Sequence, residues 1–268
     1  MARLTGARDP ERPAVTALPQ QAGKTANGAP DCWLTDSRIS LGLGTAAVLV
    51  TALSARRDRV GQREAQTFRI INDLPDSIYG PVWVIMQLGA LGAAPAAAIA
   101  ALLAHDRELA GRLLAGGTAS WAMSKLVKRM VRRPRPAALI SDARIRGREA
   151  SGLGYLSGHA GVAVAMGAAA LPRLSRSRRA IVAAAVPVVG LSRIYVGAHL
   201  PLDVAGGAGL GLAVEAAVTL VWHLSGHENK RGGVTRDSLC LLLPVAAEAC
   251  DTDLLHLAQA VCPRYQGW

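Results

Sequence analysis

Long runs of apolar residues without a single charged side chain constrain this chain more than any other feature. One run, ISLGLGTAAVLVTALSA, covers residues 39–55, and a second, YGPVWVIMQLGALGAAPAAAIAALLA, covers residues 79–104. A bilayer core of about 30 Å requires roughly 20 apolar residues in a helix, so the second run is long enough and the first is marginal. Because unpaired backbone polar groups are not tolerated in lipid, we expect both runs to form membrane helices.

The same pattern predicts six membrane helices within residues 38–224. The remaining four apolar stretches are residues 113–131, 159–171, 180–197 and 200–224. Residues 56–77 have apolar positions suited to an interfacial helix that ends near Pro75, and residues 105–112 are expected to form a short turn. Gly and Ala are dense in the later stretches, which allows membrane helices to approach closely. The predicted fold class is an all-α integral membrane protein with a six-helix bundle.

Two polar segments flank this predicted membrane domain. Residues 1–37 are rich in Pro, Gly and Arg, show no cleavable signal peptide and are predicted to be a disordered tail. Residues 225–268 are predicted to be a second disordered tail, on the cytoplasmic side, with no indicated role. Basic residues occur at both expected membrane surfaces, so the positive-inside rule does not decide the orientation.

Composition narrows the possible partners. The net charge is +11, and the basic residues cluster at the ends of apolar runs, which favours phosphate or lipid head groups over nucleic acid. The four cysteines have no metal-ligand spacing, so neither a metal site nor another cofactor is predicted. Heavy use of Ala, Gly and Arg with only four lysines indicates a GC-rich, bacterial genome. For a bacterial protein with several membrane helices, the expected location is the inner membrane. The oligomeric state is not indicated.

Three polar clusters stand at the edges of the predicted helices. They read KRMVRRPRP (128–136), YLSGHA (155–160) and SRIYVGAHLPLD (192–203). The predicted helices alternate in direction across the bilayer. The end of the third helix, the start of the fourth and the connection between the fifth and sixth therefore share one membrane surface. We expect the three clusters to form one site there.

These residue types suit phosphate chemistry. Lys128, Arg135 and Arg193 offer positive charges and many N–H donors, and an arginine fork matches phosphate oxygens. Ser157 and Gly158 precede a predicted helix N-terminus, where backbone N–H groups bind anions. Together they predict a cradle for a phosphoryl group whose transition state spreads negative charge over several oxygens.

Two histidines would supply the chemistry. His199 lies four residues before Asp203, so on a helix the two side chains would share one face. Such a carboxylate fixes the imidazole tautomer and stabilises its positive form, which makes His199 a candidate nucleophile on phosphorus. His159 would then protonate the leaving oxygen and later activate water.

The three clusters resemble the signature of the type 2 phosphatidic acid phosphatase family. The matching motifs are K-x6-RP (128–136), SGH (157–159) and SR-x5-H-x3-D (192–203). That family includes lipid phosphate phosphatases, bacterial isoprenoid diphosphate phosphatases and vanadium haloperoxidases. One residue departs from the pattern, because Leu156 stands where the second motif usually begins with proline.

The resemblance implies metal-free hydrolysis of a lipid phosphomonoester or diphosphate at the extracytoplasmic membrane surface. Its implied phosphate-binding residues are Lys128, Arg135, Ser157, Gly158 and Arg193, and its implied catalytic residues are His159, His199 and Asp203. The substrate would be a polyprenyl phosphate or diphosphate, or a lipid like phosphatidic acid. Two alternatives remain open: a phosphotransferase that passes the group to another lipid, and a non-catalytic protein that binds anionic lipids, which Leu156 alone favours.

Overall fold

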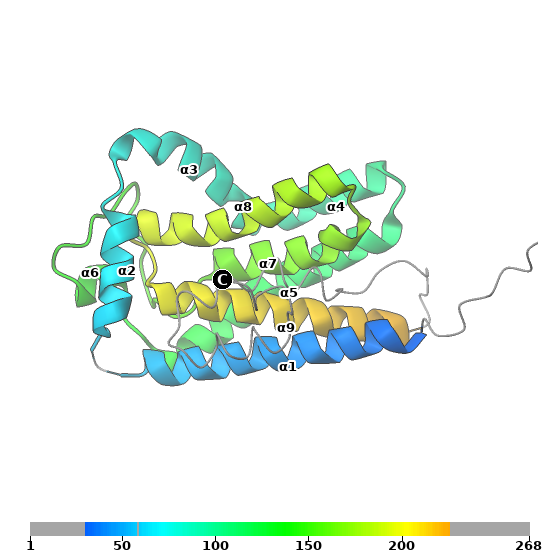
Figure 1. The fold of residues 1–268 in the computed structure, drawn as a ribbon, viewed down its shortest axis with the longest axis horizontal. Helices are drawn as coiled ribbons and strands as arrows, with labels where there is room; N and C mark the ends of the chain where they lie inside the picture. The colour runs from blue at the N-terminus through cyan, green and yellow to red at the C-terminus, as the bar shows by residue number, and fades with distance from the viewer. Residues whose placement is uncertain (1–29, 58, 226–268) are drawn as a thin grey trace, which may run out of the picture.

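The computed structural model describes residues 30–57 and 59–225, and within them all regular structure is helical (Figure 1). The elements are α1 (Pro30–Ala55), α2 (Gln62–Asn72), η1 (Asp76–Ile78), α3 (Tyr79–Met86), η2 (Gln87–Gly89), α4 (Ala93–Leu103), α5 (Arg107–Val131), α6 (Pro136–Leu139), α7 (Gly158–Ala170), η3 (Leu171–Arg173), α8 (Arg176–Tyr195) and α9 (Pro201–Leu224). The long helices lie side by side, and α2 and α6 lie at one end of the bundle (Figure 1). The all-α prediction is confirmed.

Fewer than six helices satisfy a length and hydropathy criterion for crossing a membrane. Within the described residues, Asp36–Ala55 and Pro201–Leu224 satisfy it, and the bent pair Asp76–Gly89 and Ala93–Leu103 does so if counted as one span. Helix α7 has only 13 residues, α5 carries charges near both of its ends, and α8 starts with arginines. The count of six therefore stays a prediction.

The expected continuous helix over residues 79–104 is wrong, because the chain bends by 72° between its two halves. Helix α3 ends at Met86, η2 follows, and α4 starts at Ala93. Gly89 lies against α7: a Cβ there would be 2.5 Å from the carbonyl oxygen of His159. The absence of a side chain at Gly89 thus allows the α3–α4 bend to approach the first turn of α7.

Two other boundaries differ from the prediction. Residues 107–112 belong to α5 rather than to a turn, because Asp106 caps the helix by accepting a hydrogen bond from the Leu109 backbone N–H at 2.9 Å. Helix α1 starts at Pro30, so the predicted tail boundary at residue 37 falls inside a helix. The rest of the N-terminal tail and residues 226–268 lie outside the described residues.

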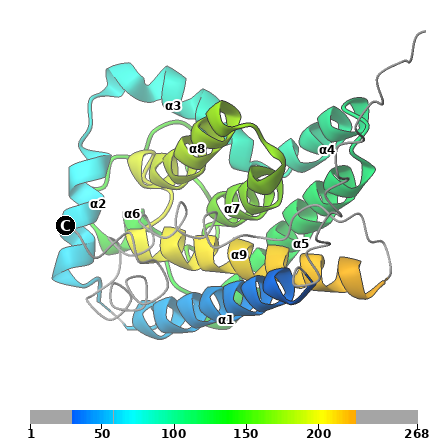
Figure 2. The same ribbon diagram turned by 45° about the vertical axis from the view of Figure 1, so that its right-hand side comes forward.

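Helix α7 is the centre of the bundle, in contact with α5, α8 and α9 (Figure 2). Its sequence, GHAGVAVAMGAAA, has small residues at most positions, and this permits close packing. A Cβ on Gly211 of α9 would lie 2.3 Å from the carbonyl oxygen of Gly161 on α7, so these backbones touch. This packing brings the N-terminal ends of α7 and α9 together.

The opposite end of the bundle is joined by one buried and one half-buried ion pair. Arg112 of α5 pairs with Glu215 of α9 and donates to Thr219 Oγ1 at 2.7 Å. Arg173, in the turn before α8, pairs with Asp106 at 2.8 Å. The two turns around residues 105 and 173 therefore share one end of the bundle.

Candidate active site

The three polar clusters converge on one pocket of about 210 Å³ at the end of the bundle where α7 and α9 start. Six of the eight predicted site residues line it: Lys128, Arg135, Gly158, His159, Arg193 and His199. The other lining residues are Gly89, Ala90, Leu91, Trp121, Ser124 and Lys125, from the α3–α4 bend and from α5. The sequence prediction that one surface gathers these clusters agrees with this geometry.

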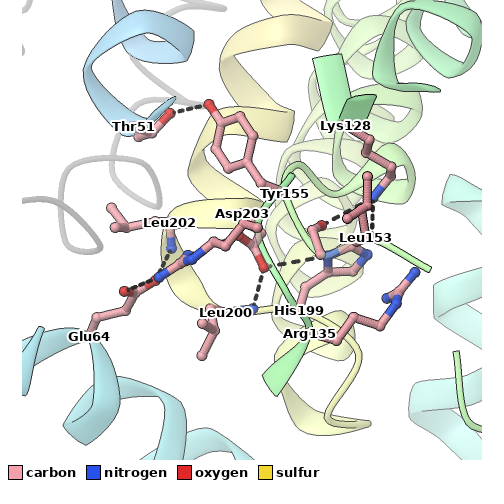
Figure 3. Close-up of polar contacts among 12 residues, drawn as sticks. Thr51, Glu64, Lys128, Arg135, Leu153, Tyr155, His199, Leu200, Leu202 and Asp203 are labelled. Atoms are coloured by element: carbon pink, nitrogen blue, oxygen red, sulfur yellow. Dashed lines mark hydrogen bonds and ion pairs between the residues drawn. The ribbon is translucent and has the colours of Figure 1, made fainter. Parts of the chain in front are cut away.

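Lys128 ties the end of α5 to the loop that leads into α7. Its Nζ donates to the carbonyl oxygens of Leu153 at 3.3 Å and Gly154 at 3.1 Å (Figure 3). The Gly154 backbone N–H in turn donates to the Arg133 carbonyl at 2.7 Å. Both acceptors are neutral backbone carbonyls, so these hydrogen bonds supply no counter-charge to the ammonium.

Both arginines are anchored to neutral groups as well. Arg135, at the start of α6, donates from Nη1 to the Ala198 carbonyl at 2.7 Å and from Nη2 to the Ser151 carbonyl at 3.1 Å. Arg193, in the last turn of α8, contacts the Met86 sulfur, and its Nε has no hydrogen-bond partner among the described residues. These contacts aim the guanidinium groups while leaving donors for a ligand.

The pocket therefore concentrates positive charge without a counter-ion. Within residues 30–57 and 59–225, no carboxylate forms an ion pair with Lys128, Arg135 or Arg193. Arginines elsewhere in the described chain, such as Arg112 and Arg133, are paired with acids. Partly buried cations without a carboxylate partner cost free energy that a bound anion would recover, so the arrangement favours anion binding.

Ser157, one of the predicted phosphate-binding residues, is the N-cap of α7 in the structure, and its phosphate-binding role stays a prediction. Its side chain is fully buried and does not line the pocket; its Oγ accepts from the Ala160 backbone N–H at 3.4 Å and so caps α7. Its own N–H donates to the Asp203 carbonyl at 2.7 Å. Gly158, the next residue, does line the pocket, where a Cβ would lie 3.0 Å from Ser124 Oγ.

His199 and Asp203 are close, although not on one helical face. His199 precedes α9, whose N-cap is Leu200, so the expectation of a shared helix face is wrong. The two are brought together by the cap instead: Asp203 Oδ2 accepts from the Leu200 N–H at 2.8 Å and lies 3.7 Å from His199 Nδ1 (Figure 3). Burial, with the charges of Lys128, Arg193 and Arg135, holds the pKa of His199 well below 6.5. The imidazole is therefore neutral at neutral pH.

Two charged residues beside this pair were missed by sequence reasoning. Arg133 bridges Asp203 and Glu64 of α2, with all three side chains buried. In the sequence Arg133 looks like one of several basic residues beside Arg135. A signal was available for Glu64, because it lies four residues before the apolar Phe68, on the buried face of an amphipathic helix.

Leu156, the departure from the second motif, is an apolar core residue. It is fully buried and packs with Ala55, Tyr155 and Leu210. The neighbouring Tyr155 hydroxyl donates to the Val48 carbonyl of α1 at 2.8 Å. The loop before α7 is thus held by side-chain packing at the position of the usual proline.

The described residues thus form an all-helical bundle with apolar helices and, at one end, a pocket lined by three cationic side chains and two histidines. Residues 109–226 match the sequence model of the PAP2 superfamily. The chain is 35% identical over 180 residues to the decaprenylphosphoryl-5-phosphoribose phosphatase of Mycobacterium tuberculosis, an alignment that covers 66% of this chain and 90% of that protein. The chain therefore belongs to the PAP2 superfamily.

Two solved structures share the fold. The crystal structure of Aquifex aeolicus LpxE is 22% identical, with a TM-score of 0.53, and the match covers 59% of this chain and 94% of that one. The transmembrane PAP2-type phosphatidylglycerolphosphate phosphatase of Bacillus subtilis is 23% identical, also with a TM-score of 0.53, over 70% of this chain and 98% of that one. At these identities the likeness concerns the fold.

Proposed function

We propose that the protein is a membrane phosphatase that hydrolyses a phosphomonoester or diphosphate of a lipid through a phosphohistidine. The observation that carries this proposal is a pocket with two histidines in which Lys128, Arg135 and Arg193 pair with no carboxylate of the described residues. The negative charge of a phosphoryl group would balance these cations. Membership of the PAP2 superfamily supports the same reaction class.

The proposed reaction has two displacement steps. In the first, the unprotonated His199 Nε2 forms a bond to phosphorus while the bond to the leaving oxygen breaks, and His159 gives that oxygen a proton. In the second, His159 takes a proton from water, whose oxygen bonds to phosphorus as the P–N bond breaks. Phosphate leaves and both imidazoles return to their starting state. Lys128, Arg135 and Arg193 stabilise the equatorial oxygens in both transition states.

Asp203 would support the positive imidazole that forms in the first step. Its Oδ2 is 3.7 Å from His199 Nδ1, slightly beyond hydrogen-bond distance. Catalytic hydrogen bonds often shorten when substrate binds. The proposed role is therefore an N–H to carboxylate bond that keeps Nε2 directed at phosphorus.

A lipid substrate fits the surroundings of the pocket. Trp121 and Leu91 line it and are exposed, and exposed apolar side chains such as Leu49, Leu53 and Leu103 occur on the outer helices. Such surfaces are covered by lipid in membrane proteins. We propose that the six spans are α1, the bent α3–α4 pair, α5, α7, α8 and α9, in a bacterial inner membrane with the pocket on the extracytoplasmic face.

The name of the Mycobacterium tuberculosis relative favours one substrate type among those considered. That protein is a phosphatase of a decaprenylphosphoryl sugar phosphate. A polyprenyl-linked phosphate is therefore the first candidate, ahead of a glycerolipid phosphate. A phosphotransferase would use the same histidines, and a non-catalytic lipid-binding protein would need neither.

The test is phosphate release by purified protein in detergent, without added metal and with EDTA, against polyprenyl and glycerolipid phosphates. We expect wild type to release phosphate and His199→Ala to release none. Asp142→Asn, which removes only an exposed ion pair with Arg69, serves as the matched control and should keep wild-type activity. Equal rates for wild type and His199→Ala would contradict the proposal, and loss of activity with EDTA would contradict a metal-free mechanism.

A further inference from the structure

A buried chain of three charged residues connects the helix outside the bundle to the proposed nucleophile. Arg133, after α5, lies between Glu64 of α2 and Asp203 of α9. We propose that Glu64 and Arg133 are positioning residues, which orient Asp203 and through it His199. This inference rests on the proposed function, and it assigns α2 a part in catalysis.

The contacts form a continuous hydrogen-bonded chain. Arg133 donates from Nη1 and Nη2 to Glu64 Oε1 and Oε2, at 2.9 and 2.6 Å, a bidentate pairing. The same Nη1 donates to Asp203 Oδ1 at 2.9 Å. The side chains of Glu64, Arg133 and Asp203 are only 6%, 4% and 0% exposed, so water scarcely screens these interactions.

Arg133 and Leu200 together fix both oxygens of the Asp203 carboxylate. Oδ1 is held by Arg133, while Oδ2 is held by the Leu200 N–H at 2.8 Å and lies toward His199 (Figure 3). With both oxygens restrained, the carboxylate plane cannot rotate away from the imidazole. Without Arg133, only the Leu200 bond would set the plane.

The charges of the chain explain why Glu64 is needed in addition to Arg133. A fully buried carboxylate requires a nearby positive charge to stay ionised, and Arg133 supplies it. A lone Arg133 would neutralise Asp203 and could use its second N–H group on Oδ2. Glu64 accepts from Nη2 of Arg133, so this nitrogen is not available to Asp203 Oδ2. The charges of Glu64, Arg133 and Asp203 then sum to one net negative charge, which can stabilise the imidazolium of His199.

Helix α2 is attached to the start of α9 by a second contact. Glu64 Oε1 also accepts from the Leu202 backbone N–H at 3.2 Å (Figure 3). Phe68, one turn further along α2, is fully buried in a cluster with Leu200 and Val204. The carboxylate of Glu64 therefore restrains both the side chain of Asp203 and the helix turn that bears it.

The test is a double-mutant cycle on phosphate release from a lipid phosphate. Glu64→Gln should lower kcat about 10–100-fold, the range typical of residues that orient a reacting group, with KM changed less than about twofold. In the Asp203→Asn background the same change should cause no further loss, because Glu64 acts through Asp203. Arg69→Gln, an exposed change on the same helix, should leave kcat unchanged in both backgrounds.

Each alternative result has a distinct meaning. The positioning role would be overturned if Glu64→Gln kept the wild-type kcat, or if it lowered kcat equally in the wild-type and Asp203→Asn backgrounds. In either case the proposed function would still stand, provided that His199→Ala is inactive. No activity in wild type would overturn the proposed function and this inference with it. If Glu64→Gln does not fold, Arg133→Lys is the second test, because one ammonium group cannot hold the carboxylates of both Glu64 and Asp203. A reduced kcat at unchanged KM in this variant supports the positioning role, and a wild-type kcat overturns it.

Discussion

One oxygen of Asp203, Oδ2, accepts a hydrogen bond from the Leu200 backbone N–H at 2.8 Å and also lies 3.7 Å from Nδ1 of His199. The helix cap and the candidate catalytic pair thus share one atom. Because the cap places Oδ2 in a fixed position, the imidazole needs only a small movement to make its hydrogen bond. The start of α9 therefore has both a folding role and a proposed chemical role.

The first prediction concerns this shared atom. Asp203→Asn keeps the shape of the side chain but removes the charge that stabilises a positive His199. We expect kcat for phosphate release to fall about 10²–10⁴-fold, as for carboxylates that orient a catalytic histidine. Steady-state kinetics on a lipid phosphate measures it, with detergent-phase thermal unfolding to verify the fold. A loss below threefold in a folded variant would show that Asp203 does not support the imidazole.

The second prediction concerns the pH profile of kcat/KM. The pKa of His199 is lowered by burial first and then by the charges of Lys128, Arg193 and Arg135, so the neutral imidazole persists below pH 6.5. On the acid side of the profile, activity should therefore be lost only as the pH falls well under that value. Lys128→Met removes one repelling charge, which raises the pKa, so its acid limb should move to higher pH.

The pH profiles of wild type and Lys128→Met are measured with the same substrate. The titration of the substrate's own phosphate then affects both profiles equally. A Lys128→Met limb at the same or a lower pH than that of wild type would contradict this electrostatic account. A general fall in kcat/KM for the variant is expected as well, since Lys128 lines the pocket.

The third prediction uses two glycines of the α3–α4 bend. A Cβ at Gly89 would lie 2.5 Å from the His159 carbonyl oxygen and 2.6 Å from Val189, whereas a Cβ at Gly92 has nothing within 4 Å. Gly89→Ala should displace the start of α7 and lower kcat about 10–100-fold, because small misplacements of reacting groups are costly. Gly92→Ala should retain wild-type kcat. Equal kcat values for the two variants would argue against close packing at this bend.

The fourth prediction concerns the opposite end of the bundle. Glu215→Ala leaves the buried Arg112 without its closest acid, and breaking such a pair costs about 3–5 kcal/mol of unfolding free energy. Thermal unfolding in detergent should show a lower midpoint, while kcat at low temperature stays near that of wild type. A large fall in kcat with an unchanged midpoint would mean that this ion pair acts on the site and not on stability.

The sequence predicts the residues that meet in the pocket better than it predicts the helices that carry them. Apolar runs and polar motifs are local signals, and alternating helices bring their ends together whatever the exact boundaries are. The cap by Asp106 and the contact of Gly89 with α7 depend on neighbours in space, and for this reason the turn at 105–112 and the unbroken helix over 79–104 were wrong.

Long-range pairing accounts for the site residues that the sequence did not reveal. Glu64 and Arg133 are 69 positions apart, and nothing in either local sequence points to the other. Conversely, Ser157 matches the family motif, but its hydroxyl caps α7 and does not line the pocket. A motif indicates which residues matter, while packing decides what each one touches.

The central claim, that His199 attacks phosphorus, is tested most directly by trapping the phosphoenzyme. The protein in detergent is mixed with a ³²P-labelled lipid phosphate and quenched in base within one turnover. We expect label on the protein that is stable in base and labile in acid, the property of a phosphoramidate. The label should map to the peptide that contains His199 and be absent in His199→Ala. Label on another residue, or turnover in His199→Ala at the wild-type rate, would contradict the account.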